Sequence, residues 1–273
     1  MENAALNNVI RQFARMGAEV EVNTVEDRRG FGRPAAFRAN VVGTGKQERF
    51  SFTINNENLA GIQVIDIDPK GRHILLNVTP TSDRPGVSAE PTKLLLGHDE
   101  MHWFVAPVVR SAINIDAAKQ SLKPTVVQEA QKRAKTKRKH LHKRHQEAFI
   151  RQGEWFFVPR PDLVVDEKLT LKKEPIRRGA GKPHTCEEIY RTGGTSVWVC
   201  PRYPNGVTYA QYVKIFDENA EAKSWHWRQM QRGATVYARG RVTHRDHHTV
   251  VLQGWHEVIP NTEKSNTFVA FLD

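Results

Sequence analysis

Pairs of apolar segments joined by turn-forming residues are the feature that most restricts how this chain can fold. Residues 62–68 and 73–78 flank one such turn, where Asp68, Pro69 and Gly71 supply the chemistry of a type I turn. Residues 93–96 and 102–109 flank a bend at 97–100, and residues 235–242 and 249–258 flank a third turn. Because segments that follow one another usually pair, each pair predicts a β-hairpin in a largely antiparallel sheet.

The remaining patterns indicate an α+β protein in three parts. Leu6, Val9, Ile10 and Phe13 have helical spacing before Gly17, which predicts an N-terminal helix. Apolar and polar residues alternate at 20–24 and 50–54, as in half-buried strands. We predict an antiparallel β domain with an N-terminal helix (1–110), a long basic connecting helix (111–152) and a C-terminal mixed α+β domain (153–273). In the last part we expect further strands at residues 155–158, 196–200 and 267–273, and helices at residues 186–191, 208–216 and 220–230.

The connecting helix is predicted from an unbroken basic stretch. After Pro124, which a first helical turn tolerates, no Pro or Gly occurs until Gly153. Apolar residues at 127, 134, 141 and 148 repeat every seven positions and give one narrow seam. Residues 132–144 contain eight basic residues and no acidic one, against a net charge of +11 for the whole chain. Such a block repels itself unless it faces a polyanion, so nucleic acid is the expected partner, with a solvated surface as the alternative.

A second basic motif lies at residues 176–184, where glycines alternate with basic residues. Glycine lets backbone N–H groups approach a phosphate, although the spacing is not that of a P-loop. An ordinary exposed loop fits the same residues equally well. We predict that the helix and this loop line one phosphate-binding groove, with contacts from Lys132, Arg133, Lys135, Lys137, Arg138, Lys139, Lys143, Arg144, Arg151, Arg177, Arg178 and Lys182.

Histidines near the C-terminus are the candidates for chemistry. His244, His247, His248 and His256 gather around Asp246, and His184 follows the Gly-rich loop. Histidine pairs bind metals or act as general acid and base in phosphodiester cleavage. His247 with Thr249 matches one His-x-Thr element of two-histidine phosphoesterases, but the second copy is missing. A hydrophilic hairpin turn is the favoured interpretation, and His184, His244, His247 and His248 are the catalytic candidates if the protein is an enzyme.

Another histidine pair, His98 and His102, lies beside Asp99 and Glu100 in the bend at 97–100. Gly-His-Asp-Glu is common turn chemistry, and the HExxH pattern is absent. We therefore predict neither a metal site nor a cofactor.

Aromatic residues and the absence of DNA-reading motifs favour RNA slightly over DNA. Trp225 and Trp227 lie among polar residues and could stack on unpaired bases, whereas Trp155, Phe156 and Phe157 are expected to be core. No RRM, KH or zinc-finger signature is present.

Cys186 and Cys200 lack Cys-x-x-Cys spacing and are expected to be reduced thiols. No signal-peptide core or apolar stretch of membrane-spanning length is visible, which predicts a cytoplasmic protein without a membrane partner.

Four blocks of the sequence resemble an uncharacterised bacterial family of hypothetical proteins. They are GHDEMHWFVAPV, QGEWFFVPRP, GKPHTCEEIYRTGG and YARGRVTHRDHHTVVLQGWHEVIPNTE, which cover about half of the chain. The resemblance implies no activity. The sequence alone therefore predicts a nucleic-acid-binding protein, with two alternatives: a histidine-dependent nuclease or phosphodiesterase, and a structural subunit of a ribonucleoprotein or phage-like assembly that also has a protein partner.

Overall fold

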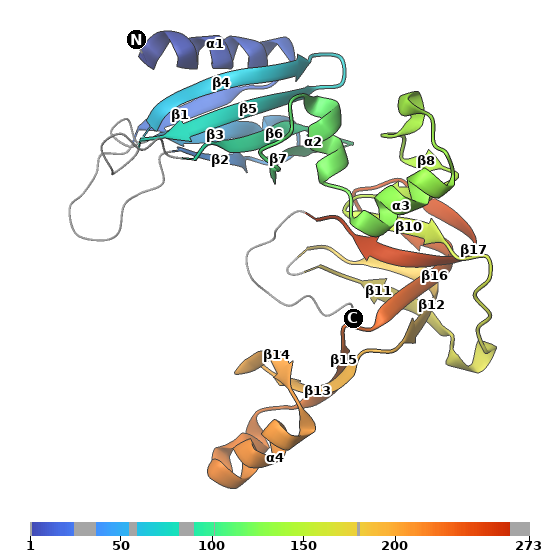
Figure 1. Ribbon diagram of the computed structural model, residues 1–273. Coiled ribbons are helices and arrows are strands. Elements are labelled where there is room, and N and C mark those ends of the chain that lie inside the picture. The colour runs from blue at the N-terminus through green and yellow to red at the C-terminus, as the bar shows by residue number, and fades with distance from the viewer. Residues whose placement is uncertain are drawn as a thin grey trace. The chain divides into compact units, whose positions relative to one another are not determined.

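The computed structural model describes residues 2–24, 37–54, 59–81, 90–100, 102–178 and 181–262. The chain forms two compact units, residues 1–123 and 124–273, which we call the N-terminal and C-terminal units (Figure 1). Both units combine helices with β-sheets, so the protein is a mixed α+β protein. In the described part of the chain, no helix has both the length and the apolar character needed to cross a membrane.

In its described residues, the N-terminal unit contains two sheets and two α-helices. Its elements are α1 (Glu2–Arg15), β1 (Val20–Thr24), β2 (Phe37–Val42), the 3₁₀ helix η1 (Gly45–Gln47), β3 (Arg49–Ile54), β4 (Leu59–Asp68), β5 (His73–Pro80), β6 (Thr92–Asp99), β7 (His102–Val108) and α2 (Ile115–Ser121). Strands β4 to β7 pair in sequence order as an antiparallel meander, which confirms the two hairpins predicted here. The second sheet has the order β1-β3-β2, and its β1–β3 pair is parallel.

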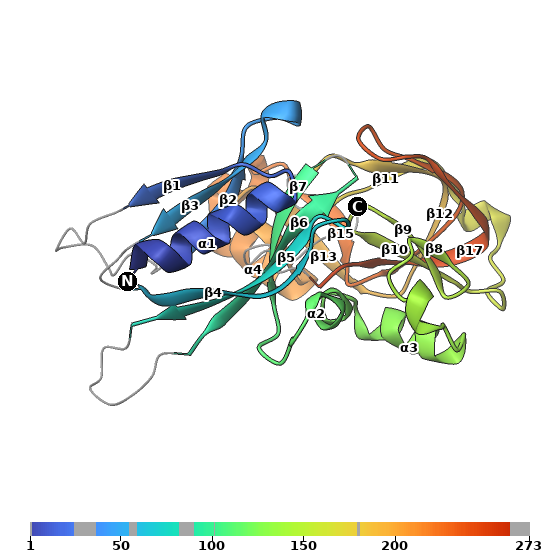
Figure 2. The same ribbon diagram turned by 90° about the horizontal axis from the view of Figure 1, so that it is seen from above.

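Helix α1 closes the larger core of this unit and lies along β4 (Figure 2). The Phe13 side chain is fully buried, and its ring contacts Phe50 and Phe52 at centroid distances of 5.0 and 5.4 Å. The helix ends where expected, because Gly17 adopts a φ of +71° that a side chain disfavours. On the other face of the four-stranded sheet, α2 buries Ile115 and Ala118.

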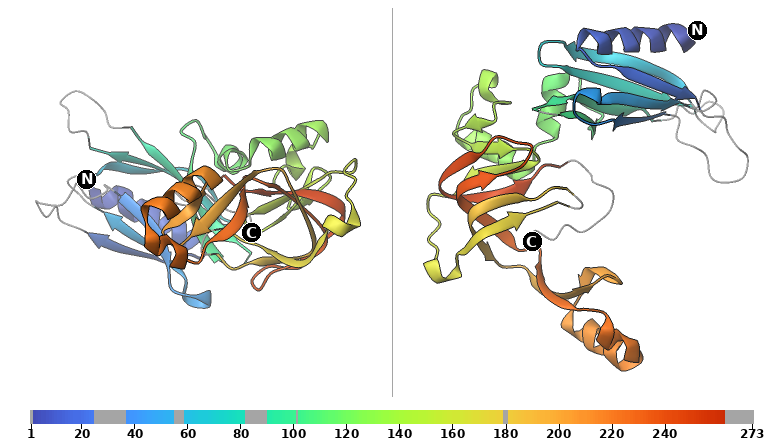
Figure 3. Two further views of the ribbon diagram at one scale, coloured as in Figure 1. Left: turned by 90° about the horizontal axis from the view of Figure 1, so that it is seen from below. Right: turned by 180° about the vertical axis from the view of Figure 1, so that it is seen from behind.

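The C-terminal unit is built on one antiparallel sheet of seven strands in the order β11-β12-β16-β17-β10-β9-β8, which curves strongly (Figure 3). Its elements are α3 (Thr125–Arg133), η2 (Arg138–His140), β8 (His145–Gln146), β9 (Phe149–Gln152), β10 (Trp155–Pro159), η3 (Glu167–Leu169), β11 (Leu171–Ile176), β12 (His184–Thr192), β16 (Thr235–Thr243) and β17 (Val250–Pro260). The β16–β17 hairpin confirms the third predicted pair. One face of the sheet buries Trp155 and Phe157, and the other packs Phe149 and Phe156 against α3.

An insertion lies between β12 and β16. It contains β13 (Thr195–Cys200), β14 (Tyr203–Val207), α4 (Tyr209–Glu218), η4 (Ala220–Ser224) and β15 (Arg228–Arg232), with sheet order β14-β13-β15. The expected helix at 208–216 is confirmed as α4. Thr208 and Gln211 form a capping box at its N-terminus. Trp227 is packed among the aromatic rings of the insertion and stacks on Tyr203 at 5.7 Å.

The prediction of one long basic helix is wrong. Helix α3 ends at Arg133, Lys135 adopts a φ of +48°, and the Thr136 N–H bonds to the Gln131 carbonyl at 3.0 Å. This is a helix-ending turn without glycine. The chain then continues through η2 into the short strand β8, so the predicted middle part at 111–152 is divided between the two units.

Two shorter helix predictions are also wrong. Residues 186–191 belong to β12, where a bulge between Cys186 and Glu188 turns Cys186 and Ile189 to the same face although they are three residues apart. Residues 220–230 form η4 and part of β15 rather than one helix. The strand expected at residues 267–273 lies outside the described residues.

Candidate functional site

His184 lies where the apolar interior of the curved sheet gives way to polar groups. It is the first residue of β12, its side chain is fully buried, and Cys186 lies two positions further along the strand in the core. The edge of the Trp155 ring packs against the imidazole at a centroid distance of 6.4 Å. Burial raises the pKa of the Cys186 thiol to about 12, with Arg191 opposing, so Cys186 is a core residue and not a nucleophile.

Gln152, the last residue of β9, fixes the orientation of the His184 ring. The Gln152 amide nitrogen donates to the carbonyls of Val242 at 3.1 Å and His248 at 2.7 Å, which points its carbonyl oxygen at His184. That oxygen lies 2.9 Å from His184 Nδ1, and therefore Nδ1 carries the proton. His184 Nε2 is then the nitrogen with a lone pair, and it is buried without a hydrogen bond.

The β16–β17 turn brings two more imidazoles beside the His184 ring. The ring of His244 lies 4.1 Å from that of His184 and 4.6 Å from that of His247, and all three rings are nearly parallel. One side-chain nitrogen from each histidine lies within 4.8 Å of the others. His184 is 60 residues away from His244 in the sequence, and the pairing of β12 with β16 joins them.

The β9–β10 turn supplies a carboxylate and the space for the rings. Glu154 Oε2 lies 3.4 Å from His184 Nε2. Gly153 has a φ of +57°, and a methyl group there would lie 2.7 Å from His247 Nε2. Burial acts to raise the pKa of Glu154, whereas His184 and His247 in their protonated forms and a backbone hydrogen bond lower it, and together they hold the pKa below its usual value.

Lys182 of the Gly-rich motif contacts the turn that carries His244 and His247. Lys182 pairs with Asp246 at 2.5 Å, and Arg178 donates to the Asn261 carbonyl at 3.0 Å and also contacts its side chain. The backbone N–H of Asp246 donates to His244 Nδ1 at 3.1 Å. Burial lowers the pKa of His244, the neighbouring His184 and His247 lower it further, and Asp246 and Glu154 oppose the change. Arg178 and Lys182 are thus held by intramolecular contacts at the border of the histidine group, and Arg177 is exposed.

We call His184, His244, His247 and Glu154 the histidine site. Three imidazoles and a carboxylate are the side chains that transition metals prefer, and they are also the groups that carry out general acid–base chemistry. Within the residues that the structure describes, these three histidines form the one group of three or more His, Cys, Asp or Glu side chains arranged to hold a metal.

The other predicted histidines lie elsewhere. His248 is exposed in the same turn and contributes its backbone carbonyl to Gln152. His256 is buried on β17, with Nδ1 3.0 Å from the Gly254 carbonyl. In the N-terminal unit His102 pairs with Glu48 at 2.5 Å and His98 packs against Trp103, so each has a local structural contact.

The basic stretch forms an ordered loop after α3. Gln146 donates to the carbonyls of His140, Leu141 and Lys143, and Gln131 donates to the Leu141 carbonyl at 2.7 Å. Seven of the eight basic side chains between 132 and 144 are exposed, namely Lys132, Arg133, Lys135, Lys137, Arg138, Lys139 and Lys143. We call these seven residues, two in the last turn of α3 and five after it, the basic loop.

The eighth basic residue, Arg144, is half-buried. Burial and the nearby charge of Arg151 lower its pKa to about 10. Arg151 donates to the Gly153 carbonyl at 2.8 Å and lies over the Phe156 ring. Arg144 remains protonated at neutral pH, and the Arg151 contacts lie within the β9–β10 hairpin.

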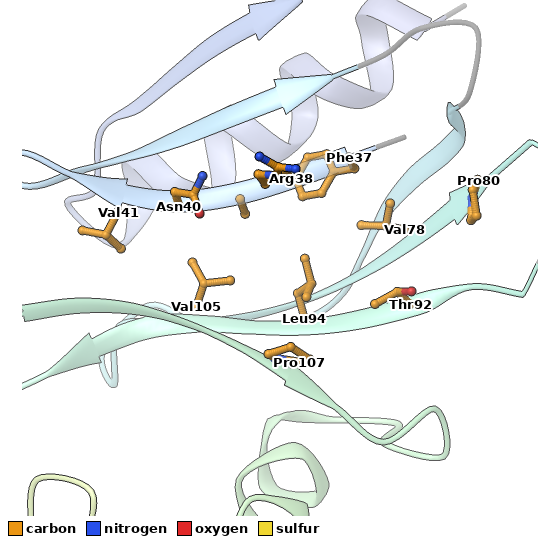
Figure 4. A pocket seen from close by; sticks show the side chains of 11 residues that line it. Phe37, Arg38, Asn40, Val41, Val78, Pro80, Thr92, Leu94, Val105 and Pro107 are labelled. Atoms are coloured by element: carbon orange, nitrogen blue, oxygen red, sulfur yellow. The ribbon is translucent and has the colours of Figure 1, made fainter. Parts of the chain in front are cut away.

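Figure 4 shows an apolar groove in the N-terminal unit between β2 and strands β5 to β7. It has a volume of about 560 Å³ and is lined by residues such as Phe37, Val78 and Leu94. Arg38 and Asn40 are its polar side chains on β2, and no group of histidines or acids converges there among the lining residues. The histidine site and the basic loop are therefore the two candidate functional sites.

Sequence patterns did not indicate Gln152, Gly153 or Glu154 as site residues. The signal that was present is the Gly-Glu pair between two apolar segments, which is typical of a hairpin turn. The long helix predicted up to Gly153 led us to overlook this turn.

Comparison of the chain with protein-family models, curated proteins and solved structures finds no match.

Proposed function

We propose that the protein binds nucleic acid, with the basic loop as its main contact to phosphates. The observation that carries the proposal is the exposure of seven Lys and Arg side chains at the end of α3 and on the segment that follows, without acidic residues between them. The two glutamines hold the backbone of the loop, so the charges are presented in a defined arrangement. Lysine and arginine neutralise phosphates and release counterions, which is the main source of affinity in such complexes.

The form of the loop supports contacts to the sugar-phosphate backbone rather than the reading of a DNA groove. Helix α3 spans nine residues, and five of the seven exposed charges follow it, two of them in the short 3₁₀ helix η2. Recognition of the major groove commonly uses a helix that carries its basic side chains into the groove. We therefore take single-stranded RNA as the first probe and DNA of the same sequence as the second.

The test compares two variants of equal charge. Replacing Lys137, Arg138, Lys139 and Lys143 with Glu changes the basic loop, and replacing Lys46, Lys70, Lys172 and Lys223 with Glu changes four other exposed positions. Each variant lowers the net charge by eight, from +11 to +3. By fluorescence anisotropy, the loop variant should lose about tenfold or more in affinity while the control stays close to the wild type. Equal losses in both variants would show that overall charge, and not the loop, determines binding.

The histidine site favours a second candidate function, hydrolysis of a phosphodiester. Three of the four histidines that sequence analysis selected converge there beside Glu154. One imidazole can remove a proton from the nucleophile while another protonates the leaving oxygen, or a bound metal can activate water. End-labelled RNA and DNA should be cleaved by the wild type, and the His247→Ala variant should be inactive. His248→Ala, which alters an exposed neighbour in the same turn, is the matched control.

Addition of EDTA separates the two chemistries. Cleavage that persists in EDTA indicates imidazole acid–base catalysis, and cleavage that stops indicates metal dependence. Wild-type protein that leaves both substrates intact with and without added metal would remove the hydrolase candidate and leave nucleic-acid binding as the proposal.

A further inference from the structure

We propose that His184, His244, His247 and Glu154 bind a divalent transition-metal ion, for which zinc is the best-matched probe. Sequence patterns predict no metal site, and the geometry of these side chains gives the reason to revise that expectation. The inference does not depend on nucleic-acid binding, because it uses other residues and its test measures the metal directly.

The buried Nε2 lone pair of His184 indicates a bound cation. Its Nδ1 proton is committed to Gln152, and its Nε2 atom is buried and makes no hydrogen bond. A buried polar atom without a partner costs free energy, and such atoms are rare in native proteins. A histidine that donates one ring N–H to a carbonyl oxygen and offers its other nitrogen is the usual arrangement of a metal ligand.

A carboxylate lies close to this lone pair. Glu154 Oε2 lies 3.4 Å from His184 Nε2, and both atoms are acceptors when His184 is neutral. They repel each other unless a cation or a shared proton lies between them. Zinc bonds of about 2.0–2.1 Å place tetrahedral ligands about 3.3 Å apart, which is close to the spacing seen here.

The two remaining imidazoles lie beside the His184 ring. The three histidine nitrogens lie within 4.8 Å of one another, and binding of a metal would require the stacked rings to rotate until the nitrogens reach ligand spacing. His244 Nδ1 accepts a hydrogen bond from the Asp246 N–H at 3.1 Å. Rotation of the His244 imidazole by half a turn exchanges the positions of its nitrogen and carbon atoms. Gly153 leaves the space that these rings occupy, since a methyl group would lie 2.7 Å from His247 Nε2.

The ligand set selects the class of metal. Imidazole nitrogen suits zinc, copper, iron and nickel, whereas magnesium and calcium prefer sites made of oxygen atoms. With three nitrogen ligands and one carboxylate, the site can hold zinc in its preferred four-coordinate geometry. The Glu154 side chain is 29% exposed, so its position faces solvent and gives the metal a route of entry.

The test uses tag-free protein stripped of metal by EDTA and dialysed. Isothermal titration with Zn²⁺ should give one ion per chain, and Co²⁺ should produce the visible absorption of a four-coordinate site. His244→Ala and His247→Ala should each weaken zinc binding by at least the 10–100-fold that loss of an outer-shell partner costs. His248→Ala should bind zinc as the wild type does.

Glu154→Gln keeps the size of the side chain and removes its charge, so it tests the fourth ligand. We expect about tenfold weaker zinc binding and a changed Co²⁺ spectrum. Thermal unfolding of each metal-free variant confirms that the fold is retained. Absence of zinc binding by the wild type, or equal binding by the His244→Ala/His247→Ala double variant, would overturn the metal site. An unchanged Glu154→Gln variant would overturn the role of Glu154.

Discussion

Gln152 holds His184 in one orientation, with Gln152 Oε1 2.9 Å from His184 Nδ1. The same amide donates to the carbonyls of Val242 and His248, and Gln152 is almost completely buried. One side chain thus connects β9 with the first residue of β12 and with the turn that carries His244 and His247. The buried position of His184 Nε2 follows from this arrangement.

Replacing Gln152 with Leu should destabilise the C-terminal unit. Leucine has a similar volume but removes three hydrogen bonds, and buried groups left without partners cost about 1–3 kcal/mol each. We expect the free energy of unfolding in urea to fall by about 2–4 kcal/mol. Gln229→Leu, at an exposed position of β15, is the matched control and should change stability by about 0.5 kcal/mol or less. Similar effects of the two changes would contradict the structural role of Gln152.

Replacing Gly153 with Ala should affect both stability and the histidine site. A left-handed conformation at a non-glycine residue costs about 1–2 kcal/mol, and the methyl group would also collide with His247. Gly233 has a φ of +74° with nothing within 4 Å of the position of an added methyl group, so Gly233→Ala measures the backbone cost alone.

Comparison of these two variants isolates the collision. Gly153→Ala should lower the free energy of unfolding more than Gly233→Ala, and it alone should weaken zinc binding by displacing the His247 ring. Zinc affinity that is equal in the two variants would show that Gly153 does not shape the site.

The hairpins were predictable because the residues that determine each turn are close together in the sequence. Asp68 and Gly71 form the turn between β4 and β5, and the Asp68 carboxylate accepts the Gly71 N–H at 2.9 Å. The end of α3 was not predictable in this way. No Gly or Pro marks Lys135, and the loop that follows is held by Gln131 and Gln146, whose contacts depend on β8 and β9 being in place.

Only part of the histidine site was predictable from the sequence, because its residues are far apart along the chain. Its histidines were visible as residue types, but only the pairing of β12 with β16 brings His184 to the β16–β17 turn. For the apolar residues at 127, 134, 141 and 148, the sequence pattern indicated burial but suggested the wrong secondary structure. Val127 and Ala148 are buried as the seam requires, yet they lie on α3 and beside β9 rather than on one helix.

Acid should weaken the C-terminal unit partly through Glu188. The hydrogen bond from Arg239 and its charge lower the pKa of Glu188, although burial opposes the shift. The ionised form is therefore favoured in the folded state. Its contribution to stability is complete above the pKa of an unfolded glutamate, about 4.3, and is lost as the pH falls through the lower folded pKa.

The Glu188→Gln variant should consequently lose stability at neutral pH and show a smaller further loss in acid than the wild type. Urea unfolding between neutral pH and about pH 3 measures this difference. Arg239→Met removes the partner instead of the carboxylate and should reduce the acid dependence in the same way. An acid dependence that is identical in all three proteins would exclude the pair as its source.

Salt dependence of RNA binding tests how many phosphates the basic loop contacts. The logarithm of the binding constant falls with the logarithm of salt concentration, with a slope of about −0.7 per neutralised phosphate on single strands. Removing four contacts with the variant at Lys137, Arg138, Lys139 and Lys143 should make the slope shallower by about 3.

Anisotropy titrations at several salt concentrations give the slopes for the wild type, this variant and the control variant at Lys46, Lys70, Lys172 and Lys223. The control should retain the wild-type slope, because its charges act at a distance and are screened by salt. A slope that changes equally in both variants would mean that the phosphates lie against another surface of the protein.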